Sequence, residues 1–400
     1  MPCCTNATLP IENSVANLPH SVLVNDNPPR ISDVLFVSNK EFTFRILKGK
    51  NIMKKTLAVA AVLAAFAGSA AADVTVYGAL DTALVFTHTE GANTVAMKAN
   101  GEETNRVGFK GSEKVSDDLT VGFKLEAEFD SDTGAASKTL MKREALVYAK
   151  TAYGEFGFGR TGSLGASTGS YAFLGGGNTG WGGGVHGVLD NGFILAGKDS
   201  RTDNTITYVS PKMAGVTLYA QVASEDGDSE FTHTADRFYA VGAKYAAGAF
   251  NAGLVATVKD YKQATDLEVA DEATVVSAYA NYDFGVAKVA VAGQYYDHLK
   301  AAASTEEDPA DFGYKGFGVT TAVVAPVAGG TLNVGLGYGE KEAVAGDEEV
   351  ELYSVGTKYV YKLSKQTALY AALGYTAEKD KATKHADEVV TALAGLYHTF

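Results

Sequence analysis

From Leu119 to Phe129 the chain alternates strictly between two kinds of side chain. As an extended strand, one face would carry Leu119, Val121, Phe123, Leu125, Ala127 and Phe129, and the other Thr120, Gly122, Lys124, Glu126 and Glu128. A period of two is typical of a β-strand whose faces meet different surroundings. In a soluble sandwich the apolar face covers a core, whereas in a membrane barrel it meets lipid and the charged face lines a wet lumen. This segment alone leaves both folds open.

The same pattern recurs in about sixteen segments, whose lengths suit the ~9–11 residues of a transmembrane strand. They begin near Val74, Arg106, Leu119, Lys142, Glu155, Asn204, Val216, Arg237, Phe250, Thr274, Val286, Tyr314, Gly330, Val350, Gln366 and Glu388. Short joins such as 210–215 alternate with long polar ones such as 223–236 and 297–313. Short periplasmic turns and long outer loops are typical of outer-membrane barrels. The sequence therefore predicts an all-β fold, a transmembrane antiparallel β-barrel of about 16 strands.

Aromatic side chains support this prediction, because amphipathic rings favour the headgroup level at the ends of membrane strands. Tyrosines gather near the predicted strand ends: Tyr77, Tyr153, Tyr208, Tyr219, Tyr245, Tyr261, Tyr282, Tyr359, Tyr361, Tyr375 and Tyr397. Leu396, His398 and Phe400 share one face of the last segment, which predicts a closing strand that runs to the end of the chain.

An export signal precedes the first strand. Residues 53–55 are a short basic stretch, residues 56–66 an apolar run, and residues 70–72 an Ala-x-Ala cleavage site, so we expect cleavage between Ala72 and Asp73. The run is shorter than the ~20 residues that a spanning helix needs, and a buried Ala-rich helix is the alternative. Because a secretory signal belongs at the start of a nascent chain, we expect residues 1–52 to be an upstream extension, 53–72 the signal peptide and 73–400 the barrel.

The balance of acidic and basic residues limits the kinds of molecule that the chain can bind. The chain has 34 basic and 47 acidic side chains, and residues 1–72 hold 7 and 4 of them, which leaves the exported part with 27 and 43, a net charge of −16. This acidity argues against nucleic acid, because neutralising phosphates needs a basic face. Both cysteines, Cys3 and Cys4, precede the cleavage site, so no disulfide or thiol chemistry is expected after it.

Motifs of enzymes and cofactor sites are weak. Residues 157–162 match G-x-G-x-x-G, but residues 163–170 are a poor helix start, so nucleotide binding is not expected. The seven histidines form no H-x-x-x-H pair, and no metal site is expected. No nucleophile elbow is visible in the sequence. Because a catalytic triad is recognised by its geometry and not by its order in the chain, an outer-membrane hydrolase stays as the enzyme-class alternative. We therefore expect no catalytic residue and no cofactor.

Six segments, in order along the chain, resemble the Gram-negative general porins, in particular the proteobacterial type with a long third loop. They resemble the family's first three strands, the strands that enter and leave the third loop, and the terminal signature: residues 73–82, 105–113, 118–126, 153–160, 201–211 and 395–400. Each piece alone would be weak, but the ordered combination covers nearly all of residues 73–400.

The resemblance implies a sixteen-stranded barrel, a homotrimer, and a third loop folded into the lumen. It also implies that arginines on the wall face acids on that loop, with a transverse field that screens solutes by size and charge. By position the wall arginines are Arg106 and Arg160, with Arg201 a further candidate. By alternation, Arg143, Lys110 and Lys124 are candidate neighbours in the lumen.

The third loop departs from the family pattern. The family's loop commonly has an acidic tip, whereas residues 161–200 are dominated by Gly and Ser and hold only two acids, Asp190 and Asp199. The constriction is therefore expected to be less polarised or differently placed. Trp181 has two interpretations, packing of the loop against the wall or contact with solutes, and packing is favoured because a Trp is mostly apolar area.

The expected function is passive diffusion of small hydrophilic solutes and ions across the bacterial outer membrane. A non-conducting structural or adhesive barrel is the alternative. Acidic runs in the outer loops could bind divalent cations that bridge lipopolysaccharide, although plain solvation is the favoured interpretation. The acidic balance favours cations and the wall arginines favour anions, so ion selectivity stays open, with a weak lean toward cations.

Overall fold

The computed structural model describes residues 74–182, 188–189, 191–195, 197, 201–224, 236–261, 272–299, 313–344 and 348–400. They belong to one compact unit of the chain, Gly68–Phe400. Residues 1–72 and Asp73 lie outside the described residues, so the upstream extension, the signal peptide and the cleavage after Ala72 stay predictions. In the described ranges no helix has the length and apolar character that crossing a bilayer requires.

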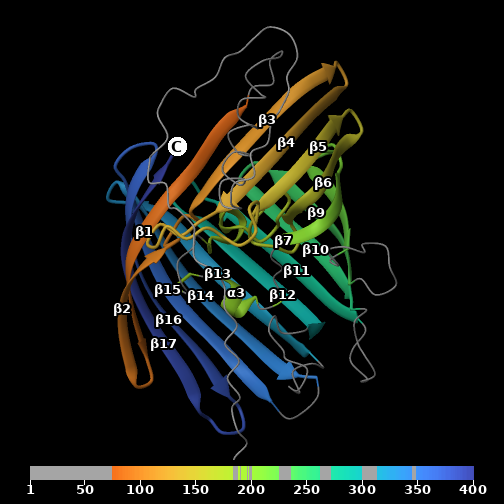
Figure 1. The fold of residues 1–400 in the computed structure, drawn as a ribbon. Helices are drawn as coiled ribbons and strands as arrows, with labels where there is room; N and C mark the ends of the chain where they lie inside the picture. The colour runs from red at the N-terminus through yellow and green to blue at the C-terminus, as the bar shows by residue number, and fades with distance from the viewer. Residues whose placement is uncertain are drawn as a thin grey trace, which may run out of the picture. The chain divides into compact units, whose positions relative to one another are not determined.

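The described chain is built almost entirely from antiparallel strands (Figure 1). Their bounds are β1 Thr75–Thr89, β2 Ala92–Ala99, β3 Arg106–Ser116, β4 Leu119–Glu128, β5 Glu144–Thr151, β6 Gly154–Gly162, β7 Arg201–Val209, β8 Val216–Ser224, β9 Arg237–Ala247, β10 Phe250–Asp260, β11 Glu272–Asp283, β12 Lys288–Leu299, β13 Tyr314–Val327, β14 Gly330–Ala343, β15 Glu349–Lys362, β16 Thr367–Asp380 and β17 Ala386–Thr399. Two short helices, α2 (Gly176–Thr179) and α3 (Asn191–Ile194), lie in the long join between β6 and β7.

Strand β1 closes the sheet. Residues 79–89 of β1 pair with β17, so the first and last strands are neighbours. On its other side, residues 75–79 pair with β3 and residues 82–89 with β2, which makes β2 and β3 two parts of one wall strand. The 17 labelled strands of the described chain therefore form a closed 16-strand antiparallel barrel. The predicted barrel is confirmed, and closure leaves no open edge for lipid to meet.

The exposed face of the wall is apolar, while the inner face carries polar groups. Leu254, Leu336 and Leu373, on three strands, are 54%, 53% and 53% exposed. On the inner faces of β8 and β11, by contrast, Gln221 and Ser277 are each 1% exposed. Soluble domains bury their large apolar side chains instead. The wall thus has the inverted pattern of a lipid-facing surface around a polar interior.

The predicted strand starts agree with the structure to within three residues, with one exception. The second wall strand begins at Ala92 and not at Arg106, because residues 100–105 interrupt it. This polar stretch, which starts with Asn100 and Gly101, looks like the end of a loop in the sequence, and it hid the short strand before it.

The predicted asymmetry of the joins is present. Ala328 and Gly329 alone connect β13 to β14, with φ angles of 48° and 81°. Positive φ at both positions is required by the tight hairpin turn whose twist matches that of its strands. Residues 163–200, by contrast, connect β6 to β7.

Several of the tyrosines expected at strand ends lie on the exposed face, among them Tyr153, Tyr245 and Tyr282. Tyr77 and Tyr219 differ, because they line cavities on the inner side of the wall. Their places in the alternation of β1 and β8 point them inward.

Replacing Leu373 by Arg should destabilise the folded barrel by about 2–4 kcal/mol, the cost of a cation near the midplane of the lipid face. The matched control is Thr376→Arg, which places the same side chain on the inner face of the same strand, β16, where we expect a much smaller loss. The measurement is urea-induced unfolding after refolding into lipid vesicles. Equal losses in the two variants would contradict the assignment of the faces.

Candidate functional site: a charged cavity between the wall and the β6–β7 join

The join between β6 and β7 packs against the inner face of the wall. Helix α2 contacts β11, β12 and β13, and α3 contacts β13, β14 and β15. Asn281 Nδ2 donates to the carbonyl oxygen of Asn178 at 2.8 Å, and Lys288 Nζ to that of Gly177 at 2.7 Å. The backbone N–H of Gly197 donates to Gln294 Oε1 at 2.7 Å. Backbone groups in two parts of the join, α2 and Gly197, are therefore bonded to inward-facing side chains.

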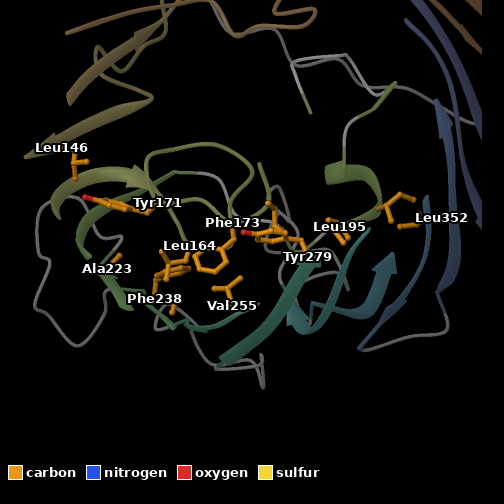
Figure 2. Packing of buried hydrophobic residues seen from close by; sticks show 14 residues of the cluster. Leu146, Leu164, Tyr171, Phe173, Leu195, Ala223, Phe238, Val255, Tyr279 and Leu352 are labelled. Carbon is orange, nitrogen blue, oxygen red and sulfur yellow. The ribbon is translucent and has the colours of Figure 1, made fainter. Parts of the chain in front are cut away.

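An apolar cluster also connects the join to the wall. Figure 2 shows Leu164, Tyr171, Phe173 and Leu195 of the join beside inner-face residues of the wall strands, which are Leu146, Ala223, Phe238, Val255, Tyr279 and Leu352. Burying such side chains is worth roughly 1.5–3 kcal/mol each. The join is therefore attached to the wall by the hydrophobic effect as well as by hydrogen bonds.

Trp181 is a packing residue. It is 1% exposed, and its Nε1 donates to the carbonyl oxygen of Thr321 at 2.9 Å. The ring lies against Gly335, where a Cβ would come within 2.7 Å of the indole. The geometry thus favours packing against the wall over contact with solutes.

Next to this packed half, a cavity of about 630 Å³ remains between the join and the wall. Its described lining includes five basic and four acidic side chains. They are Arg106, Lys124, Arg143, Arg201 and Lys358, and Glu102, Glu103, Glu126 and Glu144. The join contributes small or neutral residues, such as Ser167, Gly169 and Gly176. Among the described residues, the charged side chains of the cavity therefore come from the wall and from the interruption between β2 and β3.

Glu126 is the centre of a network of cations. Its carboxylate lies 2.8 Å from Arg143 Nε, 3.1 Å from Lys124 Nζ and 3.7 Å from Arg106 Nε. It also accepts a hydrogen bond of 3.1 Å from the hydroxyl of Tyr77. Paired and hydrogen-bonded charges of this kind hold one another in place where unpaired ones would be costly to bury.

Glu144 connects the charged wall to the join. It is 1% exposed, forms an ion pair with Lys124, and accepts hydrogen bonds from Thr161 Oγ1 at 2.7 Å and from the backbone N–H of Ser170 at 2.8 Å. One carboxylate thus holds both a cation of the wall and the start of the join.

The interruption between β2 and β3 brings two further acids, Glu102 and Glu103, to the cavity. Asp81 on β1 accepts the backbone N–H of Glu102 at 2.6 Å, and it also accepts a hydrogen bond from the hydroxyl of Tyr370. Glu102 then forms an ion pair of 2.7 Å with Lys358, and Lys358 donates to the carbonyl oxygen of Gly182 at 2.9 Å. This chain of contacts connects β1, the interruption, β15 and the join.

Comparison with known proteins decides the family of this chain. Residues 58–381 match the model of the Gram-negative porins. The chain belongs to the Gram-negative porin family. It is 30% identical to outer membrane porin protein 32 of Delftia acidovorans, over 83% of this chain and 92% of that protein. It is 29% identical to an outer membrane porin of Bordetella pertussis, over 81% of this chain and 94% of that protein.

Solved porin structures share the fold. The anion-selective porin from Comamonas acidovorans superposes with a TM-score of 0.63 at 24% identity, covering 82% of this chain and all of the other. A trimer form of OmpT from Vibrio cholerae superposes with a TM-score of 0.56 at 19% identity, covering 83% of this chain. This porin is thus a non-enzymatic diffusion channel of the outer membrane, as predicted. The hydrolase alternative is rejected.

The structure brings only some of the predicted site residues together. Arg106, Arg143, Arg201, Lys124 and Trp181 line the charged cavity of this porin. Asp190 and Asp199 lie outside the described residues.

Two predicted basic residues lie elsewhere. Lys110 lines a second, smaller cavity. Arg160 is not in the lining of either cavity, and it donates instead to Asp203 Oδ1 at 2.6 Å and to the carbonyl oxygen of Lys142 at 2.7 Å. The expectation for Arg160 rests on its position in the family resemblance, and the pairing of β6 with β7 shifts at this residue, between Gly159 and Thr161.

Five charged residues of the cavity were not predicted from the sequence. Glu126 and Glu144 had a visible signal, since Glu126 shares the polar face of β4 with Lys124, and Glu144 follows Arg143. Glu102, Glu103 and Lys358 had none. Glu102 and Lys358 are 256 positions apart, and only the barrel brings them into contact.

Gly101 should be essential for the inward course of residues 100–105. A Cβ at this position would lie 1.9 Å from the Tyr370 hydroxyl, which itself donates to Asp81. We expect Gly101→Ala to lower stability by about 1–3 kcal/mol, the usual cost of overpacking. Gly293→Ala is the matched control in a strand, because its nearest atom would be 3.7 Å away. Urea midpoints of the refolded proteins give the comparison, and an unchanged Gly101→Ala midpoint would contradict the crowding.

Proposed function

We propose that the charged cavity is the constriction of this channel, formed where the join between β6 and β7 folds into the lumen. The observation that carries the proposal is that one cavity is lined by charged side chains from the wall and by small residues from the join. Solutes would pass between the Gly-rich backbone and the fixed charges. Selectivity in channels is set by the few side chains at the narrowest point, so these residues would screen solutes by size and charge.

We infer a weak preference for anions. The described lining has one more basic than acidic side chain. Arg201 is the least compensated of the cations, since its Nε has no hydrogen-bond partner among the described residues. Local charge outweighs the net acidity of the whole chain, because distant exposed charges are screened over about 10 Å. The fold relative from Comamonas acidovorans is an anion-selective porin, which supports the same direction.

We also propose a homotrimer that stands among outer-membrane lipid and lipopolysaccharide. Support for the trimer comes from the porin family and from the trimer form of the Vibrio cholerae relative. Support for the lipid contact comes from the exposed face near the ends of β13 to β16. There Lys315, Lys379 and Lys381 form ion pairs with Glu342, Glu351 and Glu349. Such mixed charges suit anionic headgroups with their divalent counterions.

Conductance of the purified, refolded protein in planar bilayers tests the channel and its assembly together. We expect current that is linear at low voltage and closes in three equal steps, because each barrel of a trimer is a separate pore. Silent bilayers that contain well-folded barrels would reject conduction, and single steps would reject the trimer. A folded but silent barrel is the result that the adhesive alternative predicts.

Replacing Arg201 by Gln should shift the reversal potential in a salt gradient toward that of a cation-preferring pore. Removing one lining charge should lower the anion-to-cation permeability ratio about twofold or more. Arg160→Gln is the matched control, since Arg160 does not line the described cavity and its partner Asp203 is half-exposed. A shift in the control and none in Arg201→Gln would overturn the assignment of the constriction.

A further inference from the structure

A second cavity of about 360 Å³ lies along the same wall strands as the charged cavity. Its described lining includes three tyrosines and three lysines, which are Tyr148, Tyr171, Tyr219, Lys110, Lys124 and Lys150. Lys124 lines both cavities. Along β3, β4 and β5, the residues of the second cavity lie nearer to the short joins than those of the first. The two cavities are therefore in series, with the second on the side of the short joins.

Of the three lysines of this cavity, only Lys110 has no acidic partner among the described residues. Lys110 and Lys124 lie directly opposite each other on β3 and β4, and this arrangement is unfavourable for two like charges. The charge of Lys124 is compensated by Glu126 and Glu144. None of the ion pairs among the described residues includes Lys110, whose Nζ lies 5.1 Å from the centre of the Tyr77 ring. The ammonium group of Lys110 is thus able to pair with an anion.

The described lining of the second cavity contains one acid, Glu155, and this acid already has partners. Lys150 lies 3.2 Å from Glu155 Oε2, and the hydroxyl of Tyr171 donates to Glu155 Oε1 at 2.8 Å. Burial raises the pKa of Tyr171, so this hydroxyl stays a donor at neutral pH. The described lining of the cavity therefore keeps a positive excess.

Aromatic rings form much of the remaining lining. The ring of Tyr219 is held by Phe173 in an edge-on contact at 5.1 Å, and Lys150 lies 5.0 Å from the centre of the Tyr148 ring. Neither the Tyr148 nor the Tyr219 hydroxyl has a hydrogen-bond partner among the described residues. A pocket of this size with aromatic walls and a few polar groups is typical of sites for small ligands.

From these features we propose that the second cavity is a solute-binding site for small aromatic monoanions, with a carboxylate at Lys110 and a ring between Tyr148 and Tyr219. The inference rests on the proposed channel function and names one class of solute for it. An aromatic acid satisfies both parts of the lining, because the lysine binds the carboxylate and the tyrosine rings bind its ring.

Isothermal titration of benzoate into the refolded full-length protein tests the site without relying on conduction. We expect saturable binding that Lys110→Gln weakens about tenfold, because a charge-assisted hydrogen bond is lost. Tyr148→Leu removes an aromatic wall and should weaken it about threefold, which keeps the test valid if one variant fails to fold. Cyclohexanecarboxylate, of equal charge and similar size, should bind about threefold more weakly than benzoate to the unmodified protein.

Lys114→Gln is the matched control, because Lys114 lies on the same strand, pairs with Asp117 and lines neither described cavity. It should leave benzoate binding unchanged. Binding that survives Lys110→Gln, or that is lost in Arg201→Gln alone, would overturn the site by placing the anion elsewhere. A protein that conducts but binds no benzoate would reject only this inference. A folded protein that binds benzoate but does not conduct would reject only the channel constriction.

Discussion

The pairing of β1 with β17 is the constraint on which the rest of the structure depends. In hydrocarbon an unpaired backbone N–H or C=O group costs several kcal/mol, so a sheet there must have no edge. Once the sheet is closed, every wall residue points either outward to lipid or inward to the lumen. This requirement explains why apolar and polar side chains alternate between Leu119 and Phe129. It also explains why leucines such as Leu254 and Leu336 are exposed on the outer face of the barrel.

Closure also creates an interior that must be partly filled. The join between β6 and β7 covers an apolar part of the inner wall, where Phe173 packs among Phe238, Val255 and Tyr279. The charged residues line a cavity beside this packed region, where Glu144 and Lys358 also bond the join. Glu126 and Glu144 each hold several donors, so the cations around them have fixed positions. The described part of the join therefore meets one packed region and one charged region of the inner wall.

The two cavities share Lys124 and together suggest a path with two steps. In the proposed channel, the first cavity sorts solutes by size and charge with paired ions. The second offers Lys110 beside tyrosine rings, and it would retain aromatic anions briefly before release. Both proposals depend on few side chains, because channel selectivity is local. The net charge of the chain is thus a poor guide to what this porin admits.

The sequence by itself determined every wall strand except β2, the turns and the inverted faces, because a period of two and turn chemistry are local properties of the chain. The family was indicated by the ordered resemblance of six segments. The sequence also indicated Arg143 and Lys124 as inward-facing, since alternation along a strand is local too, while the family resemblance indicated Arg106. Only the tertiary structure decided where the regular strand pairing shifts, as it does beside Arg160. It alone brought Glu102 to Lys358 and Trp181 to Thr321, because such contacts join positions that closure of the barrel makes neighbours and that no local pattern connects.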